Sequence, residues 1–128
     1  MILRKIVCAA LFAFAVPAFA TDEHAPLPAK MEGGWGSTNR VAKVELIQME
    51  SPTKAKLKVA LWDGCTRQGE TTAEFKEGAW TFIAPPGPRF CEPVTVTMTQ
   101  VPEKNRFEGT YETNFRGSIA KGKLYLEW

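Results

Sequence analysis

The sequence predicts an all-β domain, an antiparallel up-and-down barrel of about eight strands, for which a β-sandwich is the alternative. Two observations predict this class. Apolar and polar residues alternate in one short segment after another, and turn-forming residues separate these segments at short intervals. No segment shows the apolar period of a helix. Because the connections are short, we expect successive strands to be antiparallel neighbours.

The segment 54–62 shows the alternation best. Its apolar side chains fall on one face and its lysines on the other: Ala55, Leu57, Val59 and Leu61 against Lys54, Lys56 and Lys58. A solvated strand face often has this composition, so the lysines do not by themselves indicate a ligand. The remaining expected strands are 33–37, 41–50, 70–77, 79–84, 93–101, 105–114 and 118–128.

Two positions predict departures from regular strand geometry. The apolar parity of the segment 41–50 changes between Leu46 and Ile47, which indicates a β-bulge. Gly109 falls on the inward face of its strand, where a residue without a side chain allows the close approach or bend that barrel closure requires.

Residues 1–20 have the three parts of a secretory signal peptide. Arg4 and Lys5 precede an apolar run from residue 6 to 16, and the small-x-small tripeptide Ala18-Phe19-Ala20 follows. The run is too short to span a bilayer, so we expect cleavage after Ala20 and no integral membrane association. The protein is then periplasmic or secreted.

The mature chain divides into a flexible leader, 21–31, and a single barrel domain, 32–128. The leader carries prolines and charges and little that can be buried. Removing Arg4 and Lys5 with the signal leaves equal numbers of basic and acidic residues. A near-neutral domain has no general electrostatic attraction to nucleic acid, which we therefore exclude as a partner.

Export leaves two cysteines, Cys65 and Cys91, since Cys8 lies in the signal. They have neither the C-x-x-C spacing nor the nearby histidine of a redox or metal site, so they predict a disulfide. The bridge closes a loop of roughly 27 residues, for which loop-closure entropy gives about 3.5 kcal/mol. In a meander the loops 62–70 and 84–93 fall at the same end of the barrel, so the disulfide and the barrel topology support each other.

The residues available for catalysis are few. His24 is the only histidine and lies in the leader, which excludes a histidine-activated nucleophile or a multi-histidine metal site in the folded domain. If cleavage fell after Thr21 instead, His24 would be third in the chain and could complete a copper(II) chelate. Asp63 and Glu92 are the remaining acid–base candidates, although both have an ordinary interpretation as turn residues. We expect no enzyme, no cofactor and no metal.

Arginines gather in the loops at the end where the cysteines fall. Together they form the predicted arginine rim: Arg40, Arg67, Arg89 and Arg116. Aromatic side chains flank the same loops: Trp62, Phe90 and Phe115. Arginine presents a planar fork to anions, and aromatics beside arginines are typical of interface anchors. The alternative is an ordinary surface in which nearby carboxylates neutralise the arginines. Trp35 and Trp80 are expected in the core.

The sequence Gly33-Gly34-Trp35-Gly36 resembles the G-x-W motif that opens the first strand of lipocalins and other calycin-like barrels. The segments 107–111 and 122–128 resemble the closing strands of small barrels of the lipocalin and avidin type. The resemblance implies an eight-stranded barrel with Trp35 plugging one end and a ligand or partner at the other.

The function expected from these features is that of an exported, non-enzymatic binding protein. It would present the arginine-rich, disulfide-tied loops to a small anionic or amphipathic ligand or to a protein partner. The alternative is an inhibitor of a secreted hydrolase that uses the proline-rich loop 85–91 as a rigid wedge.

Overall fold

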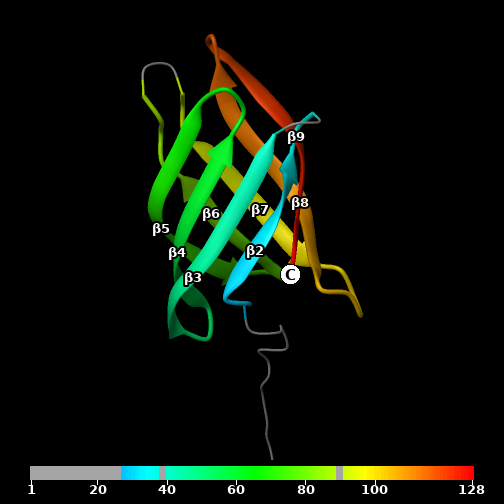
Figure 1. Ribbon diagram of the computed structural model, residues 1–128. Helices are drawn as coiled ribbons and strands as arrows, with labels where there is room; N and C mark the ends of the chain where they lie inside the picture. The colour runs from blue at the N-terminus through cyan, green and yellow to red at the C-terminus, as the bar shows by residue number, and fades with distance from the viewer. Residues whose placement is uncertain (1–26, 38–39, 89–90) are drawn as a thin grey trace, which may run out of the picture.

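The computed structural model describes residues 27–37, 40–88 and 91–128 (Figure 1). Within these residues eight antiparallel strands form one closed barrel in which each strand pairs with its neighbours in the sequence and the last pairs with the first. The strands are β2 (Lys30–Trp35), β3 (Val41–Ser51), β4 (Lys54–Trp62), β5 (Thr66–Lys76), β6 (Ala79–Ala84), β7 (Val94–Gln100), β8 (Arg106–Phe115) and β9 (Ser118–Glu127). The predicted all-β, up-and-down barrel is confirmed, and the sandwich alternative is wrong.

Two strands begin three or more residues before their expected first residues. β2 begins at Lys30 rather than at 33, and Leu27 and Met31 are buried, so the core extends into the segment assigned to the leader. β5 begins at Thr66 rather than at 70, because its pairing with β4 continues without a break up to Trp62. The predicted signal peptide, 1–20, lies outside the described residues.

The barrel interior is filled with apolar side chains. Alternate residues of every strand point inward, and the largest of the fully buried ones are Trp80, Phe82, Met31, Leu57, Leu61, Met98 and Leu126. Burying one such side chain stabilises the folded state by roughly 1.5–3 kcal/mol. Trp35 and Trp80 are 2% and 1% exposed, so both lie in the core as predicted.

The two predicted irregularities are present. The pairing of β3 with β4 shifts between Leu46 and Gln48, which leaves Ile47 as the extra residue of a bulge. A Cβ atom at Gly109 would overlap the carbonyl oxygen of Thr97 on β7. Only glycine therefore allows β8 to approach β7 this closely.

The connections alternate between the two ends of the barrel. The β2–β3, β4–β5, β6–β7 and β8–β9 connections lie together at the top of Figure 1, and we call this the disulfide end. Cys65 and Cys91 are bonded there, with their Cα atoms 5.9 Å apart, which confirms the predicted disulfide. Among the described residues there is no helix long and apolar enough to cross a membrane.

Candidate functional site

Trp35 closes the disulfide end of the barrel. It is the last residue of β2, and its indole meets the Tyr111 ring edge-on, with ring centroids 4.9 Å apart. The guanidinium carbons of Arg40 and Arg67 lie 5.3 and 5.5 Å from the centroid of the indole. Two members of the predicted arginine rim are therefore packed on the plug of the barrel rather than directed to solvent.

Arg67 is built into the interior. It is 6% exposed, and it donates hydrogen bonds to the backbone carbonyl of Glu92 at 2.6 Å and to Oδ1 of Asp63 at 2.9 Å. The same Asp63 oxygen accepts the backbone N–H of Cys65 at 3.2 Å. Arg67 thus joins the β4–β5 and β6–β7 connections beside the disulfide through its Nε and Nη1 atoms.

The other predicted rim residues have different surroundings. Arg40 is half-buried, whereas Arg116 is exposed with its guanidinium carbon 5.3 Å from the centroid of Phe115. Arg89 and Phe90 lie outside the described residues. The described arginines of the rim lie at the same end of the barrel. Only Arg116 among them is fully exposed.

Exposed apolar side chains form a crown around the disulfide end. Among the described residues the large exposed hydrophobics lie at the strand ends next to its loops, apart from Ile47, Tyr125 and Trp128. The apolar crown consists of Val41, Trp62, Ile83, Phe115 and Ile119, which are 40–62% exposed. Sequence reasoning included Trp62 and Phe115 and missed the three aliphatic members. Apolar residues at outward positions beside strand ends were the signal that could have identified them.

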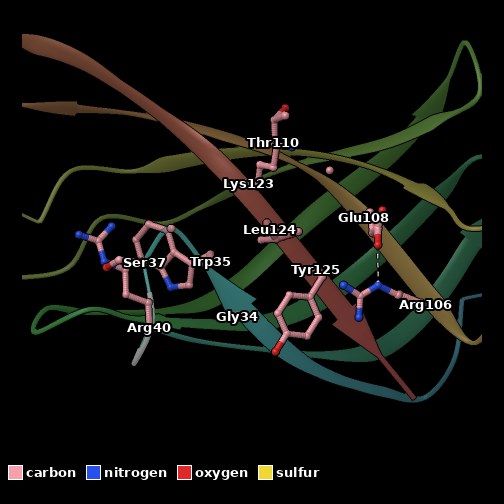
Figure 2. A pocket seen from close by; sticks show the side chains of 12 residues that line it. Gly34, Trp35, Ser37, Arg40, Arg106, Glu108, Thr110, Lys123, Leu124 and Tyr125 are labelled. Carbon is pink, nitrogen blue, oxygen red and sulfur yellow. Dashed lines mark hydrogen bonds and ion pairs between the residues drawn. The ribbon is translucent and has the colours of Figure 1, made fainter.

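An open groove runs over the outside of the barrel beside this end (Figure 2). It has a volume of about 730 Å³ and is lined chiefly by outward residues of β2, β8 and β9 and of the β2–β3 connection. Tyr125 stands in it, 39% exposed, beside Gly34 on the neighbouring strand. Of the residues that line it, the sequence proposed only Arg40 for binding, because the register that aligns the others is a tertiary property.

Arg106 holds the Tyr125 ring in position. Its guanidinium carbon lies 4.4 Å from the ring centroid, and it pairs with Glu108 at 2.7 Å and with Glu127. The hydrogen bond to Glu108 is the main cause that raises the pKa of Arg106, with smaller contributions from Glu127. Arg106 therefore stays charged but is neutralised by its own neighbours.

Two further cations line the groove without such a partner. Within the described residues neither Arg40 nor Lys123 forms an ion pair. Neither charge is therefore neutralised by a carboxylate of these residues, although the Arg40 guanidinium is also packed on the Trp35 ring. The described ranges contain no group of three histidine, cysteine or acidic residues that could hold a metal ion. Asp63, one of the two acid–base candidates, forms an ion pair with Arg67 at 2.9 Å.

Comparisons of the chain with protein-family models, curated proteins and solved structures found no match. The closed eight-stranded antiparallel barrel is compatible with a calycin-like architecture.

Proposed function

We propose that this chain is an exported, non-enzymatic binding protein that docks a protein partner through its disulfide end. The observation that carries the proposal is the apolar crown. Monomeric proteins rarely cluster large apolar side chains on one surface unless that surface binds something. Trp62 and Phe115, each about half or more exposed, supply the aromatic anchors that dominate protein interfaces.

The disulfide end is also well prepared for binding. The Cys65–Cys91 bond and the Arg67–Glu92 hydrogen bond both join the β4–β5 connection to the β6–β7 connection, which lowers the entropic cost of ordering the joined residues when a partner docks. Arg116, stacked beside Phe115, adds a charge at the edge of the apolar surface that can pair with a partner's carboxylate.

A ligand inside the barrel has less support. The resemblance to the lipocalin and avidin type, which we retain as the proposed relationship, implies a ligand at the end away from Trp35. At that end Phe107 packs against Trp128 with ring centroids 5.3 Å apart, and Phe75 packs against Trp80. These rings occupy the space that an internal ligand needs, which favours an outer surface.

The test is capture of a partner by the immobilised mature protein from the extracellular or periplasmic fraction of its source. A Trp62→Ser, Phe115→Ser variant should lose at least about tenfold of the captured protein. An Ile47→Ser variant is the matched control, because Ile47 is similarly exposed but lies outside the crown. Equal capture by both variants, with circular dichroism showing both folded, would overturn the proposal.

The hydrolase-inhibitor alternative retains one supporting observation. The N–H of Gly87 donates to the carbonyl of Cys91 at 2.8 Å, so the described parts of the 85–91 loop are held together at its base. Its proposed contact residues, Arg89 and Phe90, are outside the described residues. Replacing them should abolish capture under this alternative and leave it unchanged if the crown alone binds.

A further inference from the structure

We propose that the outer groove over β2, β8 and β9 is a second binding site, and that it takes a small acidic saccharide, a sugar ring carrying a carboxylate or sulfate group. This site lies beside the apolar crown and shares none of its residues. It is therefore independent of the proposed protein-docking function.

Two glycines leave the groove open on the β2 side. Gly34 pairs with Tyr125, and the N–H of Gly36 donates to the carbonyl of Lys123 at 2.9 Å. A Cβ atom at Gly34 would lie 3.2 Å from Cε1 of Tyr125, and one at Gly36 would lie 2.7 Å from Nη1 of Arg40. Any side chain at these positions would enter the space beside Tyr125 and Arg40.

Tyr125 supplies an aromatic surface in the groove. Its ring is partly exposed and is fixed by Arg106, which is itself held by two carboxylates. A positioned aromatic ring offers contact area at low entropic cost. The C–H face of a sugar ring is a suitable partner for it, being apolar in the centre and polar at its edge.

The unpaired cations lie on the side of Tyr125 toward the disulfide end. Lys123 is two residues from Tyr125 on the same strand face, a separation of about 6.5 Å. Arg40 lines the groove farther along, beside Trp35 and Ser37 (Figure 2). This spacing suits a ligand whose anionic group projects from the far side of one six-membered ring.

Polar side chains suited to sugar hydroxyls complete the lining. Glu108 is the cross-strand neighbour of Tyr125, and Thr110 is that of Lys123. Ser37 lies at the Arg40 end. A few placed donors and acceptors beside one aromatic surface are the usual composition of a small-ligand site.

Trp35 provides a means of detecting binding. It lines the inner side of the groove, and its buried Nε1 has no hydrogen-bond partner among the described residues. Because Arg40 packs on this indole, an anion that draws Arg40 toward itself changes the surroundings of Trp35. Binding should therefore alter tryptophan fluorescence.

The experiment titrates the ¹⁵N-labelled mature protein with sodium glucuronate and follows the backbone amides by NMR. We expect saturable shifts at Gly34, Gly36, Lys123 and Tyr125, with a parallel change in tryptophan fluorescence. Uncharged glucose should bind at least about tenfold more weakly, because it lacks the anionic group. Sodium acetate should also bind at least about tenfold more weakly, because it lacks the ring.

Variants distinguish this site from a general charge effect. Lys123→Gln should weaken glucuronate binding about tenfold, and Tyr125→Ala should weaken glucuronate and glucose alike. Lys58→Gln, which removes a lysine from the outer face of β4, should change nothing. The proposal fails if neither glucuronate nor glucose 6-sulfate gives saturable shifts, if acetate binds as well as glucuronate, or if Lys123→Gln binds normally. The Trp62→Ser, Phe115→Ser variant should retain glucuronate binding, so failure of the two proposals is separable.

Discussion

Arg67 donates its Nε hydrogen to the backbone carbonyl of Glu92 at 2.6 Å, across the same two connections that the Cys65–Cys91 disulfide bridges. The β4–β5 and β6–β7 connections are therefore joined once covalently and once by a charge-assisted hydrogen bond. Trp35 packs beneath Arg67, so the same arginine also covers the plug of the barrel. Closure of this end depends on one side chain as well as on the disulfide.

Removing the disulfide should weaken the protein without unfolding it. A Cys65→Ser, Cys91→Ser variant should lose about 3.5 kcal/mol in the free energy of unfolding, because the unfolded chain regains the freedom of a loop of roughly 27 residues. The Arg67–Glu92 hydrogen bond remains to hold the two connections. Urea denaturation of the variant and of the wild type measures the difference, and a loss below about 1 kcal/mol would contradict the prediction.

Arg67→Met should destabilise the protein by roughly 2–4 kcal/mol, because it leaves the Glu92 carbonyl without its donor and the Asp63 carboxylate without its cationic partner. Arg116→Met, at an exposed position, should change stability by no more than about 0.5 kcal/mol. A double-mutant cycle with Asp63→Asn should show coupling between Asp63 and Arg67. Equal stability of the two arginine variants would mean that Arg67 is an ordinary surface residue after all.

Gly122 makes room for Tyr111. A Cβ atom at this position would lie 2.5 Å from Cε2 of the tyrosine ring, so Gly122→Ala should cost about 1–3 kcal/mol through overpacking. Adding Tyr111→Leu should recover part of that loss, since the obstacle is a side chain. Thermal denaturation compares these variants with Lys121→Ala, an exposed control on the same strand that should remain within about 0.5 kcal/mol of the wild type.

Tryptophan fluorescence should separate the crown from the core. Trp62 is 49% exposed and Trp128 is 37% exposed, whereas Trp35 and Trp80 are almost fully buried. Acrylamide should therefore quench chiefly the emission of Trp62 and Trp128. Trp62→Phe should remove a large part of the quenchable emission, and unchanged quenching in that variant would place Trp62 away from solvent.

The predicted signal peptide implies a defined mature N-terminus. Protein recovered from the periplasm or the culture medium should begin at Thr21, since the small-x-small tripeptide directs cleavage after Ala20. Mass spectrometry of the intact protein decides this. Recovery of the uncleaved chain from the cytoplasm alone would contradict both export and the environment that the disulfide requires.

Local patterns were enough to predict the class of fold. The alternation in 54–62, the parity change at Ile47 and the inward Gly109 each predicted a feature that the structure contains, because side-chain direction in a strand follows directly from residue parity. The first and last residues of the strands were harder to predict from local patterns. Thr66 continues β5 because β4 offers it a partner, which no local signal in the sequence indicated.

The candidate sites depended more on tertiary structure. The alternation of connections between the two ends predicted that Arg67 and Arg116 lie at the same end. It could not predict that Arg67 is buried against Asp63 while Arg116 is exposed. The sequence places both arginines in connections between expected strands. They differ because Arg67 meets Asp63 and the Glu92 carbonyl of the β6–β7 connection, whereas Arg116 lies against the exposed Phe115.

The sequence by itself determined the all-β class, the alternating core and the pairing of Cys65 with Cys91, because these follow from periodicity, turn chemistry and a count of two cysteines outside the predicted signal peptide. Only the tertiary structure decided which side chains lie next to one another on the surface of the barrel. Barrel closure pairs β2 with β9, which places Gly34 beside Tyr125 and opens the outer groove. Such neighbours are far apart in the chain, and the register that unites them is set by packing of the whole barrel.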